Sequence, residues 1–158
     1  MIVSFTGHRP NKLGGYNLPN PTYLHVCQQI DKTLREIQPE KIITGMALGV
    51  DQWAANIAIK LGIPFIAAVP FTGQELAWPQ PSQKLFNRLL EKAAEVVIVS
   101  EGSYSAFKMQ IRNEWMVDRA NKVIAIWDGT KGGTGNCVEY AKSKGKEIIY
   151  INPRLTIG

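Results

Sequence analysis

The 158-residue chain has few residues that would cross-link it or coordinate a metal. It contains two cysteines, Cys27 and Cys137, and neither belongs to a CxxC pair. Its two histidines, His8 and His25, fall in separate segments. A disulfide framework and a zinc site are therefore poorly supported, and free thiols suit a reducing cytoplasm. We expect no metal site and assign no cofactor.

Targeting and membrane signals are also lacking. Residues 1–7 have no basic region and too short an apolar run for a signal peptide. No apolar stretch approaches the roughly 18 residues that span a bilayer. We therefore expect a cytoplasmic protein without a membrane partner.

Charge of one sign is not concentrated anywhere. The chain has 18 Lys plus Arg against 13 Asp plus Glu, a net charge of +5, and its lysine cluster at 142–146 is typical of a solvated helix end. This balance suits an anionic ligand, from a nucleotide to single-stranded DNA, and does not choose between them. The absence of a basic platform disfavours a nucleic-acid partner, and homo-oligomerisation is left open.

Hydrophobic residues make up 45% of the chain and charged residues 20%, which is globular composition. Short Val- and Ile-rich runs alternate with longer amphipathic segments, as in strands that helices cover on both faces. We predict strands at 2–6, 41–44, 65–69, 96–100, 123–127 and 148–151. We predict helices at 22–37, 52–61, 82–94, 110–120 and 136–144. The alternation predicts an α/β fold over residues 1–158, a single domain with a three-layer, Rossmann-like parallel sheet and helices on both faces.

Ligands of open parallel sheets bind outside the carboxyl ends of the strands, where the strand order reverses. Three glycine-bearing loops, 6–10, 44–51 and 128–135, leave predicted strands at that edge. Two longer segments, 11–20 and 71–81, have a length that is typical of functional or mobile loops. We predict a ligand site where the three loops converge.

The loop at 128–135 contains the strongest local signal, Gly132-Gly133-Thr134-Gly135, directly before a helical pattern. Glycines permit close backbone approach, and a helix start offers free N–H groups and the positive end of the helix dipole. This pattern predicts a phosphate site, although a simple turn with glycines at positive φ is the alternative. No Gly-Lys-Ser/Thr follows, so a Walker loop with ATP and magnesium is disfavoured.

The other two loops add charged candidates. Asp51 follows Gly45 and Gly49, either as the N-cap of the next helix or as a carboxylate that reaches a ribose hydroxyl, and the two roles can coexist. Arg9 directly follows a strand and is suited to bidentate phosphate contact. His8 beside it is a candidate proton carrier.

Arg112 and Met116 share a helix face at i, i+4 spacing. Met116 must pack inward, so Arg112 is expected at the ligand edge of the sheet. Paired with Glu139 across the pocket, Arg112 would form an acid–cation couple beside the phosphate loop. A structural salt bridge is the alternative. Trp53, Trp78 and Trp115 are candidates for stacking on a base, although buried packing is favoured for at least two of them.

These residues resemble the Arg-Lys-x-x-Met and Gly-Gly-x-Gly-Thr-x-x-Glu motifs of the LOG family, the cytokinin riboside monophosphate phosphoribohydrolases. The matching positions are Arg112, Met116, Gly132, Gly133, Gly135 and Glu139. Asn113 stands in place of the family's Lys, and Asn136 in place of its Thr. The resemblance implies hydrolysis of the N-glycosidic bond of a nucleoside monophosphate, with Glu139 and Arg112 as catalytic residues.

Nearly the whole chain resembles the YpsA-like branch of the SLOG superfamily, to which LOG enzymes also belong. The segments that carry this resemblance are 6–10, 44–55, 69–71, 98–102, 112–113, 127–129 and 132–134. It implies a Rossmann-like fold that holds a nucleotide or nucleotide-derived ligand at the loops above. Residues 45–51 are also similar to the Gly-x-Ala-x-Gly-Ile-Asp motif of DNA-processing protein A, which binds single-stranded DNA.

We therefore expect a nucleotide-binding protein that is a candidate phosphoribohydrolase. The alternatives are a non-catalytic sensor or sequestering protein for an NAD-derived nucleotide, and a single-stranded DNA-binding protein. The ligand-binding candidates are Thr6, Gly7, His8, Arg9, Gly45, Gly49, Asp51, Asn113, Asp128, Gly132, Gly133, Thr134 and Gly135.

Overall fold

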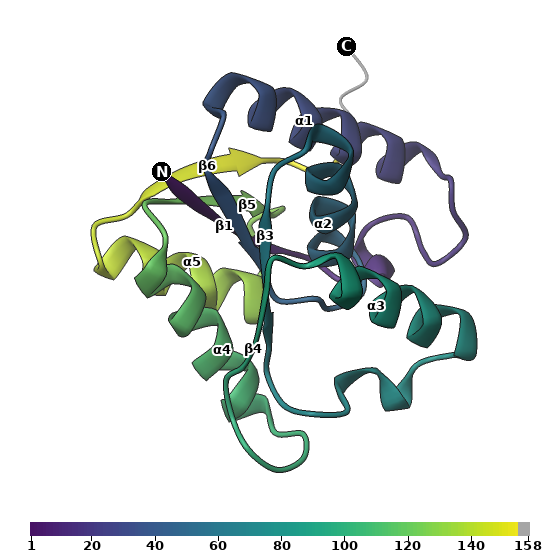
Figure 1. Ribbon diagram of the computed structural model, residues 1–158. Coiled ribbons are helices and arrows are strands. Elements are labelled where there is room, and N and C mark those ends of the chain that lie inside the picture. The colour runs from purple at the N-terminus through teal and green to yellow at the C-terminus, as the bar shows by residue number, and fades with distance from the viewer. Residues whose placement is uncertain (155–158) are drawn as a thin grey trace.

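The computed structural model describes residues 1–154 and shows one six-stranded, all-parallel sheet between two layers of helices (Figure 1). The predicted Rossmann-like α/β class is confirmed; the last four residues of the predicted domain lie outside the described range. The strands are β1 Ile2–Gly7, β2 Lys41–Thr44, β3 Phe65–Val69, β4 Glu95–Ile98, β5 Lys122–Ile126 and β6 Glu147–Ile151. The helices are α1 Pro21–Ile37, α2 Val50–Leu61, α3 Gln80–Lys92, α4 Ala106–Arg119 and α5 Gly133–Ser143, with short 3₁₀ turns η1 Pro10–Lys12 and η2 Gln74–Ala77.

The strand order is β4-β3-β2-β1-β5-β6. The chain therefore moves outward from β1 to β4 and then returns to place β5 on the other side of β1. Gly7 at the end of β1 pairs in register with Ile126 at the end of β5. This reversal of strand order puts the crevice of the fold at the carboxyl ends of β1 and β5.

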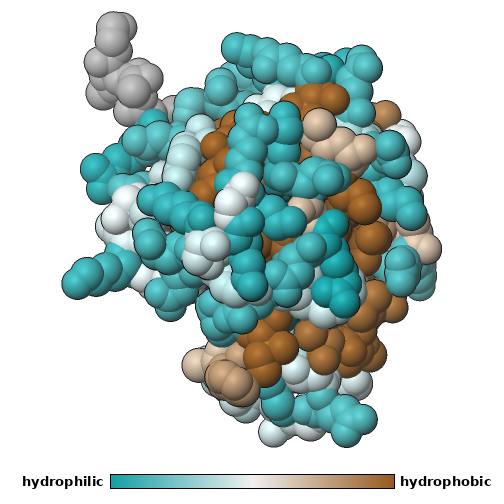
Figure 2. Space-filling model, turned by 90° about the vertical axis from the view of Figure 1, so that its left-hand side faces the viewer, coloured by the Kyte–Doolittle hydropathy of each residue, from teal (hydrophilic) through white to brown (hydrophobic). Residues whose placement is uncertain are grey.

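Both faces of the central strands are covered, which explains their continuous apolar runs. Val3 and Phe5 of β1 pack in one cluster with Val26 of α1 and Ala54 of α2. On the opposite face, Met116 of α4 packs with residues of β2 and β3 in a second cluster. The outer surface on the side of α4 and α5 is largely hydrophilic, with hydrophobic residues gathered toward the lower right (Figure 2).

The edge strand β4 is the exception to this burial. It starts at Glu95 rather than at residue 96, and Val96 and Ile98 remain 45% and 52% exposed. A sheet edge has a neighbour on one side only, so fewer side chains cover it.

All five helices begin earlier than predicted, and α4 and α5 differ most, because the residues that cap them lie outside the apolar pattern. Ser105 caps α4, its hydroxyl accepting a hydrogen bond from the Lys108 N–H at 3.1 Å, so α4 starts at Ala106 instead of residue 110. Gly132 caps α5, so Gly133 forms the first turn, before the predicted start at residue 136. The predicted N-cap role of Asp51 is wrong: Gly49, at φ 95°, is the cap of α2, and Asp51 lies inside its first turn.

Candidate functional site

A cavity of about 940 Å³ opens at the carboxyl edge of the sheet. Its walls come from the loops after β1, β2, β3, β4 and β5 and from α4, so the three predicted loops do converge. The predicted site residues that line it are Thr6, Gly7, His8, Arg9, Asp51, Arg112, Asn113, Gly132, Gly133 and Thr134. The predicted residues that do not are Gly45, Gly49, Asp128, Gly135 and Glu139.

Arg112 lies buried in the floor of the cavity, only 3% exposed. Its Nη1 donates to the carbonyl oxygens of Gly45 at 2.6 Å and Ala68 at 3.4 Å, and its Nε donates to Asn113 Oδ1 at 2.9 Å. Gly45 does not reach the cavity, but a Cβ there would lie 2.6 Å from Arg112 Cζ. The glycine therefore makes room for the guanidinium above the ends of β2 and β3.

Asp51 supplies the negative charge near this arginine. Its Oδ2 accepts a hydrogen bond from the Ala47 N–H at 3.2 Å, and the side chain lines the cavity while only 9% exposed. Burial raises the pKa of Asp51, and the charges of Arg112 and Arg9 oppose that rise. Burial likewise lowers the pKa of Arg112, with the Asp51 charge acting against it. The site thus holds a carboxyl group that is costly to ionise next to a fixed cation.

A second polar network ties the loop after β1 to the loop after β5. His8 Nε2 lies 2.9 Å from Asp128 Oδ1 and 3.2 Å from the Asp128 backbone nitrogen, and Asp128 Oδ1 accepts from the Thr130 hydroxyl at 2.6 Å and the Thr130 N–H at 3.0 Å. Lys12 Nζ donates to Thr130 Oγ1 at 2.9 Å. The Thr130 hydroxyl, with smaller help from the Thr130 N–H and His8, holds the pKa of Asp128 well below its ordinary value. Asp128 therefore acts on the cavity through His8, which lines it.

The start of α5 forms one end of the cavity. Gly132, at φ 147°, caps the helix without a side-chain hydrogen bond, and the ladder of the helix begins with Asn136 N–H bonding to Gly132 O at 2.9 Å. Gly133 and Thr134, whose N–H groups precede that first bond, line the cavity. Such groups are available to an anion.

Glu139 does not join this site. Its side chain is 72% exposed and lies 3.7 Å from Lys142 Nζ, so the expected couple with Arg112 does not form. The inward face of α5 is taken by Cys137, Val138 and Ala141, which are buried. At about 100° per residue, Glu139 then points to solvent.

The opposite end of the cavity is aromatic, and sequence reasoning identified only part of it. Phe71 and Tyr104 face each other edge to face, with ring centroids 6.0 Å apart, and Trp78 lies nearby on the loop after β3. Trp53 is buried in the cluster beneath α1 and α2, and Trp115 packs against the separate cluster on the opposite face of the sheet. Trp78 is therefore the predicted stacking residue that lines the cavity. The unusual length of the loop at 71–81 was the sequence feature that could have indicated this aromatic part of the site. Gln74, in the same loop, has a buried Oε1 without a hydrogen-bond partner.

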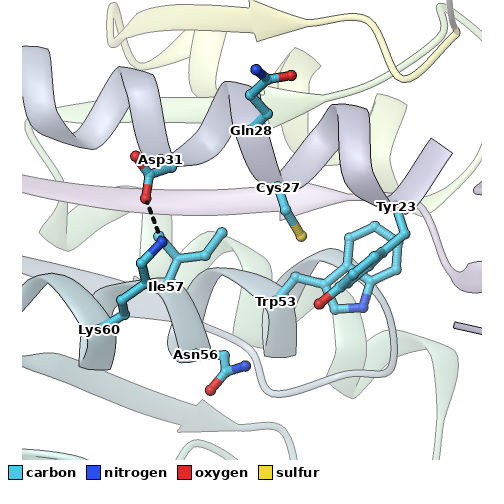
Figure 3. Close-up of a pocket in the computed structure, with 8 residues that line it drawn as sticks. All are labelled: Tyr23, Cys27, Gln28, Asp31, Trp53, Asn56, Ile57 and Lys60. Carbon is cyan, nitrogen blue, oxygen red and sulfur yellow. Dashed lines mark hydrogen bonds and ion pairs between the residues drawn. The ribbon is translucent and has the colours of Figure 1, made fainter. Parts of the chain in front are cut away.

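A separate hollow of about 470 Å³ lies between α1 and α2 (Figure 3). Asp31 and Lys60 bridge it at 3.4 Å, and Cys27 points into it beside Tyr23. Burial raises the pKa of the Cys27 thiol to about 11, so it stays protonated and unreactive at neutral pH. The hollow shares no lining residue with the larger cavity.

Two further findings concern residues 1–154. No helix there is long and apolar enough to cross a membrane. Nor does this part of the chain bring together three His, Cys, Asp or Glu side chains that could hold a metal ion.

The fold is similar to that of two solved structures. The first is DNA processing protein A from Streptococcus pneumoniae, with a TM-score of 0.68 and 20% identity over 98% of this chain; the chain spans 50% of that structure. The second is the protein of the same name from Helicobacter pylori, described with a single-stranded DNA binding mode, with a TM-score of 0.68 and 20% identity over 99% of this chain and 67% of that one. At this identity the likeness shows the fold.

Sequence relatives identify the family. The chain is 34% identical to the uncharacterized SPbeta prophage-derived protein YoqJ of Bacillus subtilis (strain 168), over 86% of this chain and 92% of that protein. A family model described as YpsA, the YspA SLOG family, matches residues 3–154. The chain therefore belongs to the YpsA family of SLOG proteins.

Proposed function

We propose that the protein binds a nucleotide in the cavity, with a phosphate group at the N-terminus of α5. The observation that carries the proposal is the start of this helix, which no side chain caps and where Gly132, Gly133 and Thr134 line the cavity. Free N–H groups and the positive end of the helix dipole stabilise an anion. Arg9 and Lys12 line the same cavity and add positive charge.

The cavity walls beyond the α5 terminus offer groups suited to the ribose and then to the base of a nucleotide. The end of β5 leads to the phosphate end, and β1 and β2 follow it across the sheet, so β2 lies about 10 Å from β5. Asp51, at the start of the helix after β2, offers a carboxyl group to a ribose hydroxyl. Phe71, Trp78 and Tyr104 beyond it offer aromatic rings to a base.

Removal of single donors from the α5 terminus tests the phosphate contact. Proline is tolerated at the first position of a helix and lacks an N–H, so Gly133→Pro deletes one donor. Gly133→Ala is the matched control, because a Cβ at Gly133 meets nothing within 4 Å and the N–H remains. Titration calorimetry should show that the proline variant binds AMP about tenfold more weakly, as expected for one bond to a charged group. The alanine variant should bind as the wild type does.

Adenosine distinguishes this result from a general loss of structure. It lacks the phosphate, so the wild type should bind it more weakly than AMP, and Gly133→Pro should not weaken it further. A panel with NAD, ADP-ribose and a single-stranded oligonucleotide ranks the ligand classes. Equal affinity for AMP and adenosine, or preference for the oligonucleotide with a steep dependence on salt, would contradict the proposal.

Hydrolysis of the N-glycosidic bond is a second candidate function, and one observation favours it. Asp51 carries the one carboxyl group among the described residues that line the cavity, and burial raises its pKa, as suits a general acid. It would protonate the departing base while water attacks the anomeric carbon, and the proton that the water releases would return to Asp51. We propose Asp51 rather than the solvent-facing Glu139 for this step, with Arg112 as its neighbouring cation. Mass spectrometry should detect free adenine and ribose 5-phosphate from AMP, and Asp51→Asn should abolish their release while Glu139→Gln does not.

A further inference from the structure

We infer that the side-chain amide of Asn113 donates a hydrogen bond from Nδ2 to the phosphate of the ligand, beside the N–H groups of Gly133 and Thr134. The inference rests on the proposed nucleotide site and assigns that site a side-chain donor. It is carried by the hydrogen bond that orients the amide, by the Nδ2 atom that this bond leaves over, and by the packing of α4 against α5.

Arg112 fixes the orientation of the Asn113 amide. Arg112 Nε lies 2.9 Å from Asn113 Oδ1. A guanidinium nitrogen can only donate, so the amide atom that faces it must be the oxygen. The amide atom that remains is therefore Nδ2, which carries two N–H donors.

These donors are open to the cavity. Asn113 is half-buried and lines the cavity, and the hydrogen bond of its side chain within residues 1–154 is the one from Arg112. In that part of the chain, the enclosed side-chain nitrogen and oxygen atoms that lack a partner are Ser4 Oγ and Gln74 Oε1. Asn113 Nδ2 is not among them, so it is both without a partner and accessible.

The packing of α4 against α5 places Asn113 at the start of α5. Each of these helices connects two parallel strands, so both run in the same direction. Val117 of α4 packs in one buried cluster with Cys137 of α5. Residues four apart lie one above the other on a helix, so Asn113 lies one turn before Val117 and Gly133 lies one turn before Cys137. Asn113 and Gly133 are therefore level with each other, and both line the cavity.

This register brings three neutral donors to one end of the cavity. The Tyr140 hydroxyl donates to Asp118 Oδ1 at 2.6 Å, so α4 and α5 also stay in contact toward their C-termini. At their N-termini, the N–H groups of Gly133 and Thr134 precede the first backbone bond of α5. Asn113 Nδ2 joins these two groups, and the three acceptor oxygens of a phosphate can receive all of them.

An isosteric substitution separates this role from the support of Arg112. Asn113→Asp keeps an oxygen for Arg112 Nε and replaces the donor by a second carboxylate oxygen, which repels a phosphate. Titration calorimetry at neutral pH should show AMP binding about thirtyfold weaker than in the wild type and adenosine binding within about threefold. Asn56→Asp makes the same charge change at an exposed residue of the hollow between α1 and α2, and it should alter neither affinity.

Asn113→Ala removes the donor without adding a charge, and it decides the question if the aspartate variant does not fold. It should bind AMP about tenfold more weakly and adenosine as the wild type does. A purely structural role of Asn113 would weaken AMP and adenosine alike, and a wild-type preference for AMP in the variants would mean that the phosphate does not meet Nδ2. Either result overturns the inference while the proposed nucleotide site stands. Equal affinity of the wild type for AMP and adenosine contradicts the proposed site itself.

Discussion

Arg112 is a buried cation whose hydrogen bonds run to the Gly45 and Ala68 carbonyls and to Asn113, with the charge of Asp51 nearby. Carbonyl dipoles and a close carboxylate are what a desolvated guanidinium needs, since an uncompensated buried charge is strongly destabilising. The arrangement fixes the floor of the cavity. It also makes the backbone at Gly45 part of the site, although no side chain stands there.

A methyl group at position 45 should therefore disturb the arginine. Gly45→Ala places a Cβ about 2.6 Å from Arg112 Cζ, so the guanidinium must leave its carbonyl partners. We expect a loss of about 3 kcal/mol in the free energy of unfolding, from overpacking and a displaced buried charge, with weaker AMP binding. Urea denaturation of Gly45→Ala against Gly133→Ala, where a Cβ meets nothing within 4 Å, measures the effect. Equal stability of the two variants would show that Arg112 has room to move.

Asp128 gives the stability of the protein a pH dependence. Its pKa in the folded state lies below its ordinary value, because the Thr130 hydroxyl, the Thr130 N–H and His8 stabilise the carboxylate. Its contribution is therefore complete above the unfolded pKa, near 3.9, and is lost as the pH falls further through the folded value. We expect Asp128→Asn to lower the free energy of unfolding at pH 7 by about 2 kcal/mol.

The difference between the wild type and Asp128→Asn should shrink below pH 4, and urea titrations at pH 7, 4 and 2.5 measure it. Asp118→Asn is a surface control, since Asp118 is exposed and its carboxylate accepts a hydrogen bond from the Tyr140 hydroxyl. A stability difference that is constant with pH would mean that the carboxylate charge is not what Thr130 and His8 recognise.

At the scale of elements, glycine at the start of α2 lets two loops touch. Gly49 has φ 95°, and a Cβ there would lie 2.8 Å from the His8 carbonyl oxygen. Gly62 at the end of the same helix also has positive φ, 73°, but a Cβ there meets nothing within 4 Å. Both glycines therefore have a positive φ that favours glycine, but only at Gly49 would an added Cβ collide with a neighbouring loop.

Alanine substitutions at Gly62 and Gly49 distinguish the cost of backbone strain alone from the cost of strain plus a steric clash. Gly62→Ala should cost about 1 kcal/mol, the penalty for a non-glycine residue in the left-handed region. Gly49→Ala should cost several kcal/mol and should also weaken AMP binding, because it pushes the loop after β2 away from His8. Thermal unfolding and calorimetry measure both quantities. Equal costs for the two substitutions would show that the loops separate freely.

The elements that could be predicted from the sequence are those whose signal is local. Continuous Val and Ile runs predicted each strand to within two residues at either end, because burial on both faces leaves no polar alternation. The starts of α4 and α5 were missed because Ser105 and Gly132 cap them from outside the amphipathic pattern. Glu139 was predicted to face Arg112 and instead faces solvent, because Cys137, Val138 and Ala141 form the buried face of α5.

The position of the cavity could be predicted because it follows from the topology of the sheet. Loops that leave parallel strands meet at one edge, so residues 6–10, 44–51 and 128–135 were bound to converge once the strands were known. Which charges pair across that edge depends on packing that no local pattern encodes. The Asp51–Arg112 proximity and the Phe71–Tyr104 contact arise between segments far apart in the sequence.

At the scale of the whole molecule, the cavity joins the two halves of the sheet. The loops after β1, β2 and β3 belong to the outgoing half, and the loop after β5 to the returning half. The hydrogen bonds between His8 and Asp128 and between Lys12 and Thr130 are side-chain ties across this divide. A ligand that spans the cavity would add further ties between the same two halves.

Nucleotide binding should therefore stabilise the protein against unfolding and slow hydrogen exchange in the loops of both halves of the sheet. At a ligand concentration about 100 times Kd, AMP should stabilise the folded state by about 2.7 kcal/mol. For a domain of this size, that corresponds to a rise of about 5–10 °C in Tm. Hydrogen exchange with bound AMP should slow in residues 6–10, 44–51 and 132–136 at once, because loops from both sides of the β1–β5 junction would close on one ligand. The hollow between α1 and α2 is the internal control, since it shares no lining residue with the cavity. Protection confined to 132–136 would mean that an anion sits at the α5 terminus alone and that the cavity does not hold the rest of a nucleotide.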